Sequence, residues 1–340
     1  MAQKKVRSTR SIFIIAVLVP ALAAATMSAT AQTYATSDDR SEPAVVHDSW
    51  SSGAPMPTAL SGVATGVIKG MVYVVGGFNN SGVFNINQIY NPKKKTWKTG
   101  MPMPTARGVG ASAVADNILY VIGGCGSGCG ELSGALSVVE AYDPASDTWS
   151  TKSPLPEPTF GMYAVAVKGV IYVVGGYVPG MGQVATVYSY NPAADSWAQE
   201  ASMNVGRDSP ATAALGARIV ASGGYGNSGF VSDNEIYSVA KNSWKTVTPD
   251  PTERVSPCFA GIAGQLYVAG GDGNPDPDPL TLVEAYSVKA NSWVTLASMP
   301  QAVIFPGSAE VGGRLYCFGG SSTGSVFLGS IYDNVQIYQP

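Results

Sequence analysis

The chain has 340 residues, of which 45% are hydrophobic and 13% are charged, and its formal net charge is −3. A weakly acidic chain without a basic run is poorly suited to nucleic acid or anionic lipid, so both are excluded as ligands. The 40 glycines and 23 prolines indicate many turns, in a length that suits one all-β domain or two ordinary domains.

The first 31 residues have the pattern of a removable secretory signal peptide. A basic start is followed by the apolar run 12–25 and then by Ala29-Thr30-Ala31, a small-x-small sequence before Gln32. An uncleaved anchor is the alternative. No later stretch is apolar enough to cross a membrane, so we expect no membrane insertion. We expect export, to the periplasm or out of the cell, after cleavage near Ala31. A flexible segment over residues 32–44 and a folded domain over residues 45–340 would remain.

A repeat of 47 to 52 residues governs the rest of the chain. Six glycine pairs each follow a tryptophan by 26 residues, and a tyrosine stands seven residues before five of the six tryptophans. The tryptophans are Trp50, Trp97, Trp149, Trp197, Trp244 and Trp293, and the pairs begin at Gly76, Gly123, Gly175, Gly223, Gly270 and Gly319. Such constant offsets indicate internal structural repeats.

Each repeat predicts four short strands, as the one between Trp97 and Trp149 illustrates. A proline-containing link at 101–107 leads to a strand of small residues at 108–114 and an apolar strand that ends in the glycine pair. A variable loop then leads to a strand that ends at the tyrosine, and a turn leads to the tryptophan strand. Short apolar or alternating runs between turn residues are typical of strands and hairpins, and no segment has useful helical periodicity.

The glycine pair, the tyrosine and the tryptophan at these offsets resemble the kelch repeat over essentially the whole mature chain, from Val45 to Pro340. The resemblance implies an all-β, six-bladed kelch β-propeller with four antiparallel strands per blade. The last repeat stops after Tyr338 without a tryptophan strand, whereas Trp50 has no tyrosine strand before it. We therefore expect residues 45–50 to complete the last blade, which would close the ring and remove two sheet edges.

The variable loops after the glycine pairs and the links between blades should share one face, where binding is expected. The kelch resemblance implies a protein, peptide or glycan ligand there, commonly held by arginines at the link position. It nominates Arg107, Arg207 and Arg254, with Phe78, Tyr177 and Tyr225, which follow glycine pairs, as stacking surfaces. The alternative is structural: such arginines would brace blades and such aromatic rings would pack loops.

The four cysteines fall into two groups. Cys125 and Cys129 lie in the longest variable loop, where a disulfide is the favoured interpretation in an exported protein. Cys258 and Cys317 fall in adjacent repeats, and the sequence favours two buried free thiols over a bridge.

No cofactor or metal is expected. Asp272, Asn274, Asp276 and Asp278 alternate as in a calcium loop, but the glycine and closing glutamate of such a loop are missing. We interpret the segment as a solvated acidic loop. The single histidine, His47, excludes the copper and iron sites that some kelch enzymes use.

These observations favour an exported, non-catalytic binding module, expected to be a monomer. The alternative is a metal-independent sugar mutarotase or epimerase, because exported sialate mutarotases resemble this chain in having a signal peptide and six kelch blades. The sequence offers no catalytic residue by motif. Glu310 in the last inner strand and Asp208 beside Arg207 are the nearest candidates for acid–base work.

Overall fold

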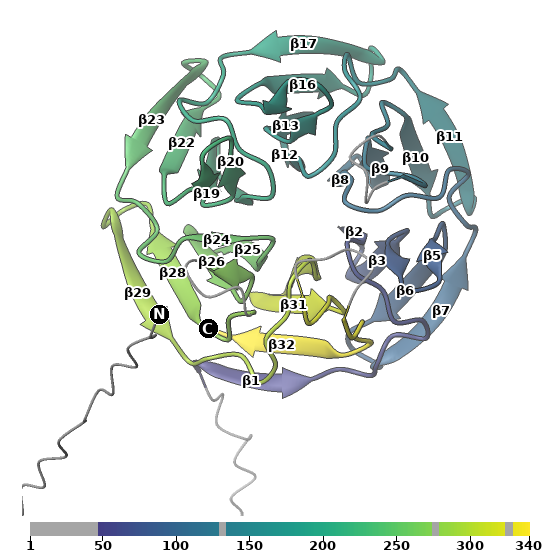
Figure 1. Ribbon diagram of the computed structural model, residues 1–340. Helices are drawn as coiled ribbons and strands as arrows, with labels where there is room; N and C mark the ends of the chain where they lie inside the picture. Colours follow the sequence, from purple (N-terminus) through teal and green to yellow (C-terminus); the bar gives the residue numbers. More distant parts are fainter. Residues whose placement is uncertain (1–46, 129–133, 274–278, 324–328) are drawn as a thin grey trace, which may run out of the picture. The chain divides into compact units, whose positions relative to one another are not determined.

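The structure, a computed structural model, describes residues 47–128, 134–273, 279–323 and 329–340. Strands are the only regular elements in these residues, and they form six four-stranded antiparallel sheets around one axis (Figure 1). The predicted six-bladed β-propeller is therefore confirmed.

Each blade runs outward from an innermost strand at the axis. Blades 1 to 3 consist of β2 (Ala64–Ile68), β3 (Met71–Val75), β6 (Asn87–Asn91) and β7 (Thr96–Gly100); β8 (Ala111–Ala115), β9 (Ile118–Ile122), β10 (Val139–Asp143) and β11 (Thr148–Lys152); and β12 (Tyr163–Val167), β13 (Val170–Val174), β16 (Val187–Asn191) and β17 (Ser196–Glu200). Blades 4 to 6 consist of β18 (Ala211–Leu215), β19 (Arg218–Ser222), β22 (Asn234–Ser238) and β23 (Ser243–Val247); β25 (Cys258–Ile262), β26 (Gln265–Ala269), β28 (Val283–Ser287) and β29 (Ser292–Leu296); and β30 (Gly307–Val311), β31 (Arg314–Phe318), β32 (Val335–Gln339) and β1 (Ser49–Ser52).

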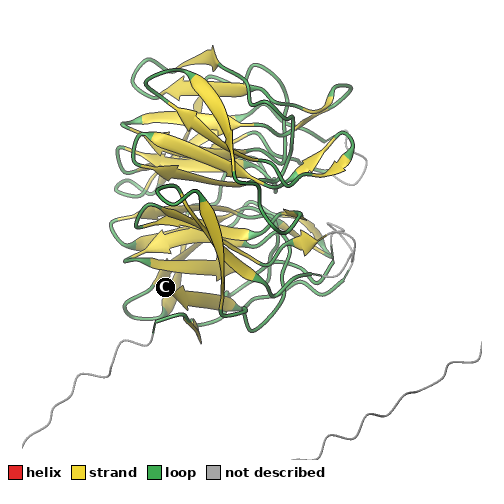
Figure 2. Cartoon of the chain, turned by 90° about the vertical axis from the view of Figure 1, so that its left-hand side faces the viewer, coloured by secondary structure: helices red, strands yellow, loops and turns green. Residues whose placement is uncertain are grey.

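Short strand pairs lie on one face of the propeller, which we call the top face; it also carries the links between blades (Figure 2). They are β4 (Phe78–Asn79) with β5 (Gly82–Val83), β14 (Tyr177–Val178) with β15 (Gly182–Gln183), β20 (Tyr225–Gly226) with β21 (Gly229–Phe230), and β24 (Arg254–Val255) with β27 (Asp272–Gly273). The glycine-pair ends of the second strands also point to this face, so the variable loops and the links meet there, as expected.

The glycine pairs join neighbouring blades. The amide of the second glycine donates to a carbonyl of the next link, as Gly77 N–H does to Arg107 at 2.9 Å. A Cβ on Gly76 would lie 2.4 Å from that same carbonyl oxygen, and both glycines have positive φ. Only glycine allows this backbone geometry and this close approach. The repeated pair is thus required by blade-to-blade docking.

The tyrosine–tryptophan pairs fill the space between blades. Tyr90 and Trp97, for example, have ring centroids 4.8 Å apart, and Trp97 Nε1 donates to the carbonyl of Ala54. The corresponding tryptophans of the other repeats also donate to a carbonyl in the chain that follows the preceding blade's outer strand. Each buried tyrosine and its tryptophan therefore hold one blade to the next.

The ring is closed by the N-terminal strand, as predicted. β1 pairs with β32 in antiparallel register, with Trp50 opposite Tyr338. The phenol of Tyr338 donates to Asp48 Oδ1 at 2.6 Å, and His47 Nδ1 lies 2.7 Å from the carbonyl oxygen of Pro340. The two ends of the propeller are thus fastened by side chains as well as by the sheet.

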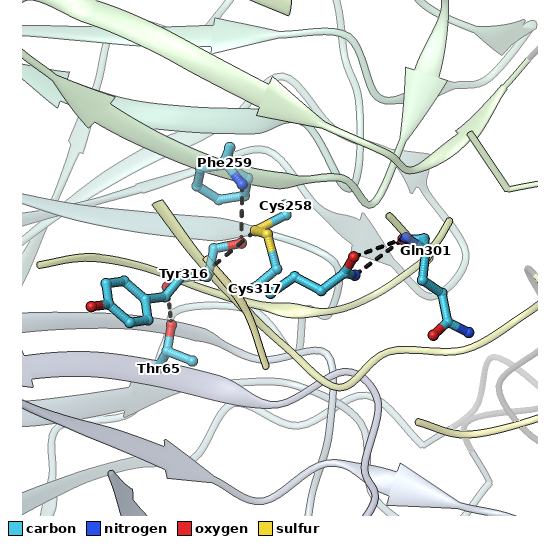
Figure 3. Close-up of a disulfide and its surroundings, with 8 residues drawn as sticks. Thr65, Cys258, Phe259, Gln301, Tyr316 and Cys317 are labelled. Carbon is cyan, nitrogen blue, oxygen red and sulfur yellow. Dashed lines mark hydrogen bonds between the residues drawn. A yellow bond between two sulfur atoms is a disulfide. The ribbon is translucent and has the colours of Figure 1, made fainter. Parts of the chain in front are cut away.

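Cys258 of β25 and Cys317 of β31 form a disulfide with a Cα–Cα distance of 5.7 Å (Figure 3). The prediction of two free thiols was wrong. Both residues are buried where blades 5 and 6 pack together, and their side chains face each other across that interface. Sequence spacing alone could not show that the two strands bring them within bridging distance.

Candidate functional site

The three nominated arginines do not line the top face. Arg107, Arg207 and Arg254 are 0 to 2% exposed, and they form ion pairs with Glu140, Glu235 and Glu284, respectively. Each glutamate belongs to the third strand of the arginine's own blade. The expectation that these arginines hold a ligand is therefore corrected: they brace each link against its blade.

Each of these arginines forms a desolvated ion pair and also donates hydrogen bonds to backbone carbonyls. Arg107 Nη2 donates to the carbonyl of Val121 at 3.0 Å, and the Thr105 hydroxyl donates to Glu140 at 2.8 Å. Burial lowers the pKa of the Arg107 guanidinium, and the charge of Glu140 opposes that shift. Removing one partner would leave the other charged and buried, which is strongly destabilising.

A sequence signal for these pairs exists in the repeats themselves. Where the link residue is arginine, the third strand carries glutamate two residues before the repeat tyrosine. Where the link residue is Leu60 or Val303, the same strand position is Gln88 or Gln336 instead. Matched variation of this kind between repeats indicates contact, and it could have predicted the burial of the arginines.

Two further nominations are corrected. Phe78 is 1% exposed and packs edge-on against Phe305 with ring centroids 6.4 Å apart, so its face is not offered to a ligand. Glu310 is exposed near the other end of its strand, where its carboxylate accepts from Gly313 N–H at 2.7 Å. Glu310 therefore does not lie at the rim of the top face.

The top face has the same paired positions in every blade. One residue of each link lies opposite the residue after the glycine pair, in an antiparallel bridge. The pairs are Ser61–Phe78, Gly108–Cys125, Phe160–Tyr177, Asp208–Tyr225, Val255–Asp272 and Ile304–Ser321. Both members are buried in blades 1, 2 and 6 but are at least partly exposed in blades 3, 4 and 5. Accessible side chains at this position are thus confined to one side of the top face.

Six side chains of blades 3 and 4 follow one another across neighbouring strands, and we call them the blade 3–4 row. Tyr177 lies opposite both Phe160 and Gln183 in the small sheet of blade 3, and Tyr225 lies opposite both Asp208 and Phe230 in that of blade 4. Directly opposite residues of an antiparallel pair project to the same side. The order of the row is Phe160, Tyr177, Gln183, Asp208, Tyr225 and Phe230.

Two ring contacts and one hydrogen bond join this row into one unit. The rings of Phe160 and Tyr177 are 5.1 Å apart, and those of Tyr225 and Phe230 are 5.4 Å apart. Between them, Gln183 Nε2 donates to Asp208 Oδ2 at 3.0 Å. An aromatic pair therefore stands on each side of a central amide and carboxylate.

The backbone of the row is also tied across the two blades. The amide of Gln183 donates to Asn227 Oδ1, and Asn227 Nδ2 donates to the carbonyl of Gln183, both at 3.0 Å. The hairpins β14–β15 and β20–β21 are thereby held together, so the row is pre-positioned before any ligand arrives.

Just inside the row, six link residues form a hydrogen-bonded circle around the propeller axis, which we call the axial ring. Six link residues each donate an amide to the carbonyl of the preceding blade's equivalent, at 2.6 to 3.0 Å, and all six have positive φ. They are Gly62, Val109, Gly161, Ser209, Ser256 and Phe305. Asp208 and Phe160 directly precede two members of this ring. The axial ring therefore fixes the inner side of the row.

A cavity of about 120 Å³ lies on the axis, and its lining includes Thr65, Ser112, Tyr163, Phe259 and Ser308. Tyr163 and Phe259 meet edge to face with centroids 4.8 Å apart, although they belong to blades 3 and 5. Burial raises the pKa of the Tyr163 phenol, with a smaller contribution from Asp208. The axis thus holds a small space that large aromatic rings fill in part.

Asp208 has an unusual electrostatic position. Burial raises the pKa of its carboxyl above the ordinary value, and the hydrogen bonds from Gln183 and Ser209 oppose this shift. Within the described residues it forms no ion pair with lysine, arginine or histidine. A carboxylate of this kind is a candidate for binding or proton transfer.

The remaining sequence candidates lie partly outside the described residues. Cys125 is buried, but Cys129 is not described, so their pairing stays a prediction. Asp272 lies in β27, whereas Asn274, Asp276 and Asp278 fall in an undescribed range. Within the described ranges, no group of three or more His, Cys, Asp or Glu side chains is placed to hold a metal ion. These residues also include no helix with the length and apolarity to span a bilayer.

Comparison with family models agrees with this architecture. The model of the KLHDC2/KLHL20/DRC7 Kelch-repeats domain matches residues 113–320, and the model of the Kelch motif matches residues 59–104. The chain belongs to the kelch-repeat family.

Two kelch relatives match over part of their length. Kelch-like protein 35 of Mus musculus is 29% identical over 151 residues, which cover 40% of this chain and 25% of that protein. Alpha-scruin of Limulus polyphemus is 44% identical over 41 residues, or 12% of this chain and 4% of that protein. The chain spans at most a quarter of the length of these relatives.

A solved structure gives the same fold. The structure of YjhT superimposes with a TM-score of 0.71 and 16% sequence identity, covering 83% of this chain and 96% of that chain. The superposition establishes a shared propeller fold, and an identity this low leaves the ligand open.

Proposed function

We propose that this kelch propeller is a non-catalytic binding module whose ligand site is the blade 3–4 row on the top face. The observation that carries the proposal is the row itself: two aromatic pairs flank a hydrogen-bonded amide and carboxylate. Aromatic side chains supply large, rigid contact surfaces, and a few placed polar groups supply orientation. The matching positions in blades 1, 2 and 6 are buried and cannot serve this purpose.

The polar groups of the row favour binding over a sugar mutarotase activity. Ring opening of a sugar needs a general acid and a general base within reach of the same substrate. The row presents one carboxylate, Asp208, and its hydrogen-bond partner is the neutral amide of Gln183. Anomeric exchange of sialic acids by the purified chain, followed by proton NMR, would support the mutarotase instead.

We also propose that the protein acts as an exported monomer. The N-terminal pattern supports secretion. The Cys258–Cys317 disulfide supports a location in an oxidising compartment, where such bonds persist.

The test of the site is a comparison of two surface changes on glycan and peptide arrays. Replacing Tyr177 and Tyr225 together by serine should abolish the signals that the unaltered chain gives. Val294→Ser should leave them intact, because Val294 is exposed on β29, away from the row. Array signals that survive the double substitution would place the site elsewhere.

A further inference from the structure

The chemistry of Asp208 indicates what kind of ligand the proposed site accepts, and this inference rests on the proposed function. Asp208 is half-buried in the centre of the row, and its described partners are the amide of Gln183 and the hydroxyl of Ser209. Both partners are neutral. The negative charge of Asp208 is therefore partly removed from water and is not balanced by a protein cation in the described residues.

The other buried carboxylates of the protein are treated differently. Glu140, Glu235 and Glu284 each bind the guanidinium group of a link arginine, and Asp250 lies 3.6 Å from Arg254. Wherever this fold fully buries a carboxylate among the described residues, an arginine accompanies it. Asp208 has no arginine partner among the described residues, and because it is half-buried its carboxylate is also accessible from outside.

The neighbours of Asp208 in the row suit a cation as well. Tyr225 lies directly opposite Asp208 in the bridge and is 40% exposed, and its ring is backed by Phe230. On the other side, Gln183 separates Asp208 from the Tyr177–Phe160 pair. Aromatic faces attract ammonium and guanidinium groups, and the attraction increases when the cation is partly desolvated. A carboxylate between two aromatic pairs combines a charge partner with cation–π surfaces.

We propose that the blade 3–4 row binds a peptide or protein segment through an arginine or lysine side chain, with Asp208 as its charge partner and Tyr225 beside it. The ligand's cation gives Asp208 the type of charge partner that an arginine provides for each buried glutamate within the protein. The aromatic pairs contact the aliphatic part of that side chain and its neighbours. Charge complementarity of this kind also accelerates encounter with basic partners, because the protein is net acidic.

The experiment uses three blocked tripeptides as probes: acetyl-Gly-Arg-Gly-amide, acetyl-Gly-Lys-Gly-amide and the neutral acetyl-Gly-Gln-Gly-amide. Binding to the full chain is followed by NMR through the amides of Tyr225 and Gly226. We expect at least one cationic probe to bind about tenfold or more tightly than the neutral probe. Asp208→Asn keeps the shape of the side chain and the oxygen that accepts from Gln183, and it should weaken binding of the cationic probe about tenfold.

Two variants complete the test. Tyr225→Leu retains apolar bulk but removes the aromatic face, and we expect it to weaken the cationic probe several-fold. Asp116→Asn makes the same charge change in the exposed turn between β8 and β9, at the other face, and should leave affinity unchanged.

The outcomes separate this inference from the proposed site. Equal affinity for the three probes, no response to either cationic probe, or full affinity in Asp208→Asn would each overturn the cationic ligand class. A neutral glycan or an acidic peptide that binds the row, and is lost in the Tyr177→Ser/Tyr225→Ser variant, would overturn it while supporting the proposed site.

Discussion

Blades 1 and 4 carry an aromatic residue at the same repeat position, yet only one of the two rings is accessible. Phe78 is 1% exposed, whereas Tyr225 is 40% exposed. A Cβ on Gly62 or Gly108 would lie 2.4 or 2.7 Å from the ring of Phe78. The ring therefore occupies space that is available only because these two residues have no side chain. In blade 4 the opposite link residue is Asp208. The residues of neighbouring links therefore determine whether the aromatic ring at this repeat position is buried or exposed.

A second contrast concerns charge at the link positions. Arg207 and Asp208 are adjacent in sequence, but Arg207 points into its blade toward Glu235, whereas Asp208 pairs through its backbone with Tyr225 at the face. One residue stabilises the blade and the other is available to a ligand. Substitutions at these positions test both differences.

The largest effect is expected from the buried ion pair. Arg207→Leu should lower the free energy of unfolding by about 3–5 kcal/mol, because it leaves Glu235 charged and buried. Adding Glu235→Gln reproduces the Leu60 and Gln88 combination of blade 1 and should recover most of that loss. Urea unfolding of the two variants measures both values, and a double variant as unstable as the single one would contradict the explanation.

Removing the buried ring of Phe78 should destabilise the protein much more than removing the exposed ring of Tyr225. Phe78→Ala should cost about 3–5 kcal/mol, as is usual for a fully buried phenylalanine. Tyr225→Ala should cost less than about 1 kcal/mol, because much of its ring is already in water. Denaturant unfolding decides this, and similar losses at both positions would mean that Tyr225 is part of the core.

The disulfide should contribute an intermediate amount. Replacing Cys258 and Cys317 by alanine should lower stability by about 2–4 kcal/mol, since the bond closes a loop with a sequence separation of 59 residues. Unfolding of the unaltered chain with and without a reductant provides the matching comparison. If both chains melt at the same temperature in non-reducing buffer, the bond contributes no net stability.

The smallest effect is expected at Asp208 and has the opposite sign. Burial raises the pKa of the Asp208 carboxyl. Ionised Asp208 therefore destabilises the folded state above this raised pKa, and the destabilisation disappears at a pH below the ordinary pKa range of aspartate. Asp208→Asn should therefore raise Tm at pH 7 by about 1–3 °C, and the gain should vanish in acid. Asp116→Asn is the control. A lower Tm for Asp208→Asn at pH 7 would mean that the ionised carboxylate stabilises the fold.

Regular features of the fold could be predicted because they recur. The constant distance from the tryptophan to the glycine pair predicts strands and turns that occur in every blade. The missing tryptophan strand after Tyr338 predicted the closing role of the segment that ends at Trp50, which pairs with Tyr338 in the ring. The glycine pair also recurs, and in all six blades the amide of its second glycine donates to a carbonyl of the next link.

The site could be predicted only in part. Tyr177 and Tyr225 were nominated from their position and are accessible, but Phe78 was nominated by the same reasoning and is buried. The kelch resemblance assigned the arginines to the face, whereas their side chains bind glutamates of a strand about 30 residues later in the chain. Gln183 was missed because it matters only through its bond to the adjacent blade.

The repeats in the sequence were sufficient to predict the blade number, the strand order and the ring closure, because these features depend on local residue patterns that recur. Packing between blades determines which equivalent side chains are buried and which are exposed, and it brings together two cysteines that are distant in the sequence. Those outcomes depend on contacts between links, hairpins and strands of different segments. A repeat pattern contains no information on how much space each neighbouring side chain leaves.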